Sequence, residues 1–268
     1  MQLSKLSSLI IFCSLLCIST SFASQNNSPL RIAVAANFTP VLKALLVEFH
    51  QKTNIETQII SGATGALFLQ IKHGAPFDIL ISADSVRPKR LEQQGLTVND
   101  SRKTYALGQL ALFSMDHKTQ LIDLEKPSKH FAIANPDIAP YGKAAKQTLQ
   151  HLGLWHQYQK NLITGINVNQ TFAQIRSRAV SSGIIANSQL VINELAGVVI
   201  PTSYHQPIEQ QLVIIKNQGN YDLAKQLSDY LLSPKVQKKI VSFGYANHEL
   251  TESIVKPLTQ QGVSHVKP

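Results

Sequence analysis

From residue 30 onward, short apolar runs alternate with amphipathic stretches. Residues 30–36 (LRIAVAA) have the continuous apolar character of a buried strand, and residues 39–53 (TPVLKALLVEFHQKT) repeat their apolar positions with a helical period. Further strands are predicted at residues 55–60 and 77–84, each followed by a helical pattern that stops at a glycine. This order of strands and helices is typical of a parallel sheet covered by helices.

A long apolar strand at residues 104–116 (TYALGQLALFSMD) leads into a second alternating set. The set closes with a returning strand, and two amphipathic helices end the patterned region. The predicted elements are strand 130–136, helices 143–153 and 169–180, strands 182–190, 197–201 and 208–216, and helices 221–232 and 233–245.

Two such sets joined by two crossings predict an α/β protein with two lobes, each a mainly parallel sheet flanked by helices, and a ligand cleft between them. The first lobe is expected to be discontinuous, and both crossings are expected to act as the hinge. The expected bounds are 24–105 plus 213–268 for lobe 1, 106–212 for lobe 2, and 105–110 and 206–212 for the hinge.

Residues 1–23 have the features of a cleavable secretory signal. A basic residue precedes an apolar run at 9–18, and small residues lead to a cleavage site after Ala23. A lipoprotein signal at Cys17 is the alternative, although Leu16 stands where a small residue is usual. Cys13 and Cys17 both lie in this segment, so the exported protein would have no disulfide and no thiolate. The expected location is the bacterial periplasm.

The net charge of +9 adds little to this prediction. The basic residues are scattered and form no stripe interleaved with aromatic residues, so nucleic acid is not expected as a partner. The positive field of such a chain would attract small anions.

No catalytic signature appears in the sequence. It lacks a G-x-S-x-G elbow, an H-E-x-x-H motif and a Walker A loop. His151 and His156 are five residues apart and do not share a helix face, so no metal site is predicted. Asp78 and Asp84 flank a strand and are interpreted as strand-end caps. We therefore predict a protein that is not an enzyme and has no cofactor.

Neutral polar residues recur where helices begin. Each alone is typical of a helix cap, but four helix N-termini that converge on a cleft could hold a small dianion without Arg or Lys. The residues at these four starts are Asn37, then Ser61 and Thr64, then Tyr141 and Gly142, and finally Val168 and Asn169.

At these positions the sequence resembles the periplasmic molybdate-binding proteins of ATP-driven importers. The resemblance covers about residues 30–245, and the segment from Ser61 to Asp84 with its GAPFD element is the most specific part. The segments that carry it are AVAANFT (33–39), SGATGALFLQIKHGAPFDILISAD (61–84), NPDIAPYGKAAKQTL (135–149), SSGIIANSQL (181–190) and SDYLLSPKVQKKIVSFGY (228–245).

The resemblance implies the two-lobed type II periplasmic binding protein fold and a site for molybdate or tungstate. By position it implies contacts from Asn37 with the adjacent backbone at Ala36, from Thr64, from Tyr141 and from the backbone amide of Val168. All would contact oxygen atoms of the oxyanion, and none would bind the metal atom directly.

The sequence departs from part of that family. One branch has serine where Asn37 stands and tyrosine where Ala186 stands, and this chain resembles the other branch, in which the hydroxyl comes from the position of Tyr141. Thr64 stands where serine is usual, which keeps the hydroxyl and adds a methyl group.

The implied function is capture of molybdate and tungstate by a monomer, followed by delivery to the membrane permease of an ABC-type importer. The nearest alternative is a receptor of the same fold for sulfate, thiosulfate, phosphate or a small organic acid. A secreted enzyme that uses the cleft and a binding lobe of a sensor or adhesion complex are alternatives of other classes.

Overall fold

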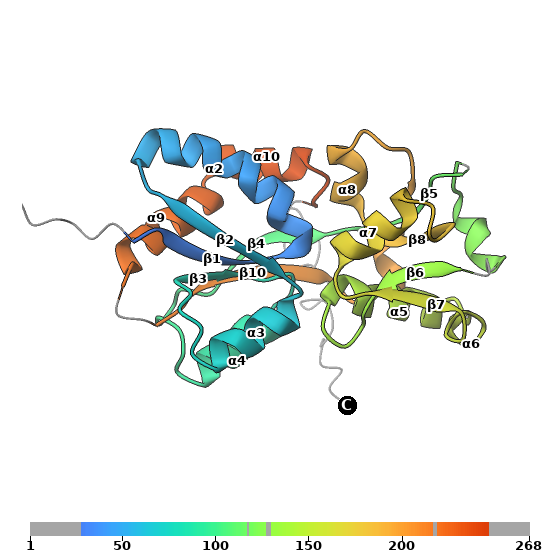
Figure 1. The fold of residues 1–268 in the computed structure, drawn as a ribbon, viewed down its shortest axis with the longest axis horizontal. Coiled ribbons are helices and arrows are strands. Elements are labelled where there is room, and N and C mark those ends of the chain that lie inside the picture. Colours follow the sequence, from blue (N-terminus) through green and yellow to red (C-terminus); the bar gives the residue numbers. More distant parts are fainter. Residues whose placement is uncertain (1–27, 117, 127–129, 217–218, 247–268) are drawn as a thin grey trace, which may run out of the picture.

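The computed structural model describes residues 28–116, 118–126, 130–216 and 219–246 (Figure 1). The predicted signal at 1–23, with Cys13 and Cys17, lies outside the described residues. Within the described ranges, no helix is long and apolar enough to cross a membrane.

The first lobe is built on a five-stranded sheet in the order β2-β1-β3-β10-β4. Its strands are β1 (Leu30–Ala35), β2 (Thr57–Gly62), β3 (Ile79–Ile81), β4 (Lys103–Gly108) and β10 (Ile208–Ile214). Its helices are α2 (Thr39–Thr53), α3 (Thr64–Lys72), α4 (Val86–Gln93), α9 (Tyr221–Leu232) and α10 (Pro234–Ser242), with the 3-10 turn η1 (Ala36–Phe38) between β1 and α2.

The second lobe repeats this plan with the strand order β7-β6-β8-β5-β9. Its strands are β5 (Leu110–Ser114), β6 (Phe131–Ala134), β7 (Leu162–Gly165), β8 (Ser182–Ala186) and β9 (Val198–Val199). Its helices are α5 (Pro140–His151), α6 (Trp155–Tyr158), α7 (Val168–Arg176) and α8 (Asn187–Ile192), with short turns η2 (Leu121–Glu125) and η3 (Thr202–Tyr204).

Each sheet has one strand that runs against the others. In the first sheet it is β10, which pairs antiparallel with β3 and β4, and in the second it is β5, which pairs antiparallel with β8 and β9. The remaining pairs of both sheets are parallel. The reversed strand is in both cases the one by which the chain enters that lobe from the other. The predicted pair of mainly parallel sheets, joined twice, is therefore what the structure shows.

Buried side chains on β1 alternate between the two helical layers of the first lobe. Ile32 and Val34 pack with α2, α9 and α10, and Ala33 faces α3 and α4 on the other side of the sheet. Figure 1 shows these two layers above and below the sheet. Because the strand side chains alternate with a period of two, a strand covered on both faces needs an unbroken apolar run.

Two predicted elements differ from the structure. The strand expected at 104–116 is two strands, because the chain changes sheets at Gln109, between Gly108 in β4 and Leu110 in β5. The strand expected at 182–190 ends at Ala186, where the Gln189 side chain accepts the Ala186 N–H at 3.1 Å and α8 begins. In both places the apolar run continues past the end of the strand, so the pattern of apolar residues does not show where the strand ends.

The sheets also place the crossings differently from the expected lobe boundaries. The boundaries at 105 and 212 fall inside β4 and β10, both of which belong wholly to the first sheet. The two crossings lie at Gln109 and between β9 and β10.

Glu48 on α2 ties the outer helices of the first lobe together. Its carboxylate accepts from Lys52 on the same helix and from Lys235 and Lys239 on α10. Hydrogen bonds from these three lysines, that of Lys235 first, lower the pKa of Glu48 far below its ordinary value. A carboxyl with a lowered pKa stabilises the fold at neutral pH. That contribution decreases as the pH falls below about 4 and is fully lost only below the lowered pKa.

We therefore predict that Glu48→Gln lowers the melting temperature at pH 7 and has a smaller effect on it at pH 2. Thermal unfolding followed by circular dichroism at both pH values measures this. An equal effect at the two pH values would mean that the ion pairs are not its cause.

Candidate functional site

A small cavity lies between the two lobes, at the carboxyl ends of parallel strands from both sheets. Its accessible volume is about 10 Å³, far below the roughly 300–1,000 Å³ usual for drug-sized ligands. All five residues predicted for the site line it. The lining residues are Ala35, Ala36, Asn37, Gly62, Ala63, Thr64, Ala83, Ala139, Pro140, Tyr141, Asn167 and Val168. None of them carries a charge.

Four helical segments start at this cavity, as the sequence predicts. They are η1 leading into α2, then α3, α5 and α7, and each contributes its first residues to the wall. The first N–H groups of a helix have no acceptor inside the helix, and their partial positive charge favours anions. The convergence of four such ends makes the wall a set of hydrogen-bond donors.

The start of α7 leaves one amide free for the cavity. The Asn167 side chain caps the helix and accepts the N–H groups of Asn169 and Gln170, both at 3.0 Å. The N–H of Val168 lies between these capped groups and has no acceptor within the described part of the chain. The Val168 amide, which the resemblance implies as a ligand contact, is therefore available as a donor to the cavity.

Thr64 is fully buried at the start of α3, where its hydroxyl oxygen accepts the N–H of Ala83 at 3.0 Å. An oxygen that accepts this bond keeps its own proton for a second partner. The Thr64 hydroxyl can therefore donate into the cavity that both residues line.

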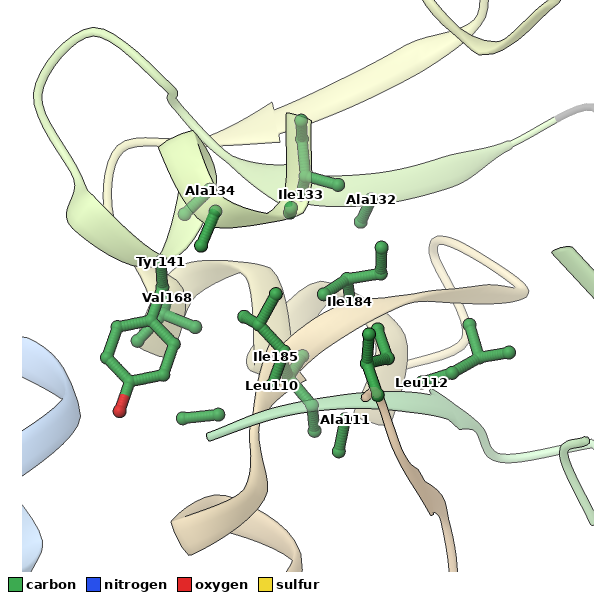
Figure 2. Packing of buried hydrophobic residues seen from close by; sticks show 14 of the residues in the cluster. Leu110, Ala111, Leu112, Ala132, Ile133, Ala134, Tyr141, Val168, Ile184 and Ile185 are labelled. Carbon is green, nitrogen blue, oxygen red and sulfur yellow. The ribbon is translucent and has the colours of Figure 1, made fainter. Parts of the chain in front are cut away.

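Tyr141 is 3% exposed and occupies the second position of α5. Its ring packs at the edge of the apolar core of the second lobe, with Val168 close by, and the hydroxyl points out of that core toward the first lobe (Figure 2). The hydroxyl oxygen accepts from Nε2 of Gln210 at 3.1 Å and lies 3.5 Å from Nδ2 of Asn37. Burial raises the pKa of Tyr141 well above its ordinary value, so the hydroxyl keeps its proton.

Asn37 differs from its predicted role as the cap of the first long helix. It lies within η1, and α2 begins at Thr39 without a capping hydrogen bond from any side chain. Its amide group donates to Oε1 of Gln210 at 2.8 Å and to the hydroxyl of Tyr245 at 3.1 Å. Both amide protons thus have protein acceptors, so the side chain holds the cavity wall in place and does not present a free donor.

Hydrogen bonds between the lobes surround the cavity. Nδ2 of Asn169 donates to the carbonyl of Ala36 at 2.8 Å, and the N–H of Gly65 donates to the carbonyl of Ile138 at 2.9 Å. Arg87 on α4 donates to the carbonyl of Asp137 at 3.1 Å. These contacts join loops that open helices in the two lobes, and so any separation of the lobes would break the cavity wall.

A wider groove continues from the cavity along the interface of the lobes. The two spaces share Ala83 and Pro140. Charged side chains line this groove and not the cavity, among them Arg87, Arg90 and Lys143. Across the part of the chain that the structure describes, no group of three His, Cys, Asp or Glu side chains could hold a metal ion.

Several other sequence predictions have a definite place. Ser61 does not line the cavity, and its hydroxyl instead pairs with that of Thr39 at 2.7 Å. Asp78 accepts from the backbone N–H of Arg31, and Asp84 accepts from that of Arg87, so both aspartates cap neighbouring segments as predicted.

Sequence reasoning missed the polar network behind the cavity. Gln210, Tyr105 and Tyr245 are buried and join Asn37 and Tyr141 in one set of hydrogen bonds. None of the three belongs to a local motif. The signal that could have indicated Gln210 is a pair of glutamines directly before the apolar run 212–215 of the predicted strand.

Comparison with known proteins identifies the family. A model described as bacterial extracellular solute-binding protein matches residues 30–246. The molybdate-binding protein ModA of Azotobacter vinelandii is 36% identical over 225 residues, which is 80% of this chain and 88% of that protein. ModA of Rhodobacter capsulatus is 34% identical over 218 residues, or 80% and 86% of the two chains.

Solved structures agree with these matches. The periplasmic molybdate-binding protein of Azotobacter vinelandii superposes with a TM-score of 0.76 at 35% identity, covering 81% of this chain and 98% of that one. A sulfate-binding protein of Mycobacterium tuberculosis has a TM-score of 0.69 at 10% identity, covering 85% and 89%, and shows the fold alone. On these matches, the chain belongs to the bacterial extracellular solute-binding protein family.

Proposed function

We propose that this protein is a periplasmic receptor that binds molybdate and tungstate and delivers them to the permease of an ABC-type importer. It acts as a monomer, catalyses no reaction and needs no cofactor. The observation that carries the proposal is the small cavity, lined by helix N-termini and hydroxyl groups and by no charged side chain. The molybdate-binding relatives in Azotobacter and Rhodobacter support the choice of ligand.

In this proposal both lobes contribute contacts to the oxyanion. The first lobe supplies the backbone at Ala36 and Asn37 and the hydroxyl of Thr64, and the second supplies the hydroxyl of Tyr141 and the amide of Val168. Uncharged donors can hold a dianion and still release it, because no ion pair has to be broken. Closure of the lobes would complete the set of donors, and the closed form would be the one that the permease recognises.

Selectivity against sulfate would come from size. Molybdate and sulfate carry the same charge, so charge alone does not separate them, whereas donors set for the longer metal–oxygen bonds of molybdate do. Receptors of this fold for sulfate, thiosulfate or phosphate are the alternatives to be tested.

Thermal unfolding of the exported chain with molybdate, tungstate, sulfate, thiosulfate or phosphate tests the proposal. A ligand at 1,000 times its dissociation constant adds about 4 kcal/mol, which corresponds to a shift on the order of 10 °C for a chain of this size. Shifts with molybdate and tungstate but not with sulfate support the proposal. A shift with sulfate, thiosulfate or phosphate alone would replace the ligand, and no shift with any of them would refute an oxyanion receptor.

Tyr141→Phe is expected to weaken molybdate binding while the fold is kept. The variant removes one hydroxyl donor, which is worth about 1–3 kcal/mol, or roughly 5- to 150-fold in affinity. Isothermal titration calorimetry measures the change, and unfolding without ligand checks stability. Unchanged affinity would remove Tyr141 from the set of ligand contacts.

A further inference from the structure

Behind the cavity, Gln210 lies against the hydroxyl of Tyr141. Gln210 is fully buried on β10, between β3 and β4 in the first sheet. The pairing of β10 with β4 shifts register between Gln210 and Gln211. Such an irregularity turns a side chain away from the direction that regular alternation would give it.

Asn37 fixes the orientation of the Gln210 amide, because its Nδ2 lies 2.8 Å from Oε1 of Gln210. The hydroxyl of Tyr105 lies 3.0 Å from the same Oε1 and shares its one proton between that oxygen and the carbonyl of Ser82 at 3.1 Å. Because Oε1 faces these two groups, Nε2 has to point the other way, toward the Tyr141 hydroxyl oxygen 3.1 Å away. The direction of the amide is therefore set by the surrounding network.

The bond from Gln210 determines what Tyr141 can do. A hydroxyl oxygen that accepts a hydrogen bond directs its own proton elsewhere, and no acceptor for the Tyr141 proton is found among the described residues. The cavity is the remaining direction, since Tyr141 lines it. The amide thus makes Tyr141 a donor to the cavity and keeps it from acting as an acceptor there.

Gly108 leaves the space in which the hydrogen bond between Gln210 and Tyr141 forms. A Cβ atom at Gly108 would lie 2.5 Å from the Tyr141 hydroxyl and 2.9 Å from Nε2 of Gln210. Gly108 is the last residue of β4, next to the point where the chain passes to the second lobe. A glycine here lets a side chain of the first lobe reach the hydroxyl of the second.

We propose that Gln210 is a positioning residue for oxyanion binding, which acts by holding the Tyr141 hydroxyl as a hydrogen-bond donor toward the ligand. The inference rests on the proposed function, because it assigns Gln210 a role in binding the same oxyanion. Gln210 does not line the cavity, and it affects binding through its hydrogen bond across the lobes to Tyr141.

Gln210→Glu tests this with a change of a single group. A carboxylate keeps an oxygen for Asn37 and for Tyr105 but replaces the Nε2 donor by an acceptor. The ionised carboxylate would accept a hydrogen bond from the Tyr141 hydroxyl, so that only the lone pairs of that hydroxyl oxygen would face the anion. The protonated carboxyl can donate as the amide does, and burial favours that form at low pH.

At pH 8.5, we expect Gln210→Glu to bind molybdate at least about 10-fold more weakly than the natural protein, because the loss of one hydrogen bond has an effect of this size. The affinity of the variant should recover as the pH is lowered toward 5.5. The natural protein should show no such recovery, since the Tyr141 pKa lies far above this range. Calorimetric titration across this pH range measures the profile, and thermal unfolding without ligand shows that the variant is folded.

Gln147→Glu is the matched control. Gln147 lines the groove beside the cavity, and its Oε1 only accepts, from the N–H of Gln206 at 3.2 Å. A carboxylate keeps that bond and adds the same charge near the cleft. The control should show no recovery at low pH. If Gln210→Glu binds like the natural protein at pH 8.5, or loses affinity equally at all pH values, the positioning role is refuted.

A second measurement separates this inference from the proposed function. In the absence of oxyanion, Tyr141→Phe should shift the side-chain amide resonances of Gln210 in a nitrogen–proton NMR spectrum, because their hydrogen-bond acceptor is removed. Unshifted resonances would refute the positioning role even if molybdate binds. A shift in a protein that binds no oxyanion would refute the proposed function, and with it the role of Gln210 in binding, while confirming the hydrogen bond.

Discussion

Asn37→Asp is expected to lower molybdate affinity by about 1,000-fold at pH 8, the largest effect that we predict for a single residue. Asn37 is 2% exposed and lines the cavity, so the new carboxylate would lie close to a bound dianion. Two unit charges about 4 Å apart repel by roughly 4 kcal/mol at an effective dielectric constant of 20.

The same substitution also disturbs the network behind the cavity. The carboxylate would place an acceptor against Oε1 of Gln210, which now accepts from Asn37 at 2.8 Å. A turn of the Gln210 amide would relieve that conflict but would remove the donor from Tyr141. Affinity should recover partly at low pH, because burial raises the pKa of the introduced carboxyl and its protonated form can donate again.

Calorimetric titration at pH 8 and pH 5.5 measures both effects. Asn135→Asp is the matched control, because the Asn135 side-chain oxygen accepts the N–H of Asp137 at 2.9 Å and a carboxylate can keep that bond. We expect this control to change affinity by less than about 10-fold, the size of a screened charge effect. An equal loss in both variants would show that Asn37 has no special place in the site.

Gly142→Ala is expected to reduce both stability and binding. Gly142 follows Tyr141 in the first turn of α5, and a Cβ atom there would lie 2.1 Å from the carbonyl oxygen of Ala134. The three nearest atoms all belong to the backbone of Ala134 and Asn135, so the start of the helix would have to move away from β6. Overpacking of this kind costs about 1–3 kcal/mol, and in tight places more.

The movement would carry Tyr141 and the N-terminus of α5 out of register with the other donors. Loss of about two hydrogen bonds to the ligand would lower affinity on the order of 100-fold. Thermal unfolding without ligand and calorimetric titration with molybdate measure the two losses separately.

Gly153→Ala is the control for this prediction. Gly153 has a φ of +72° and no atom within 4 Å of an added Cβ. Alanine in this left-handed backbone conformation should lower the free energy of unfolding by about 1–2 kcal/mol. The affinity for molybdate should not change. If Gly142→Ala behaves in the same way, the close approach of α5 to β6 does not position the site.

The amino-acid sequence by itself determined most of the fold. The helix predicted at 39–53 has those bounds as α2, and the alternation of apolar strands with amphipathic helices gave two lobes with mainly parallel sheets. It also indicated the four helix starts that meet at the cavity, because polar residues and Pro are common in and before the first turn of a helix, although among α2, α3, α5 and α7 only α7 is capped by a side chain. Such features depend on neighbours in the chain, and a sequence displays them directly.

Only the tertiary structure decided which groups at those starts are free. Asn37 has the side chain of a donor and the position of a cap, yet its amide is used by Gln210 and Tyr245, which lie 173 and 208 residues further along the chain. The free donors are instead groups such as the Val168 amide and the Tyr141 hydroxyl. Hydrogen-bond partners so distant in sequence are brought together because β10 returns to the first sheet and the end of the described chain packs into the same lobe, and no local pattern encodes them.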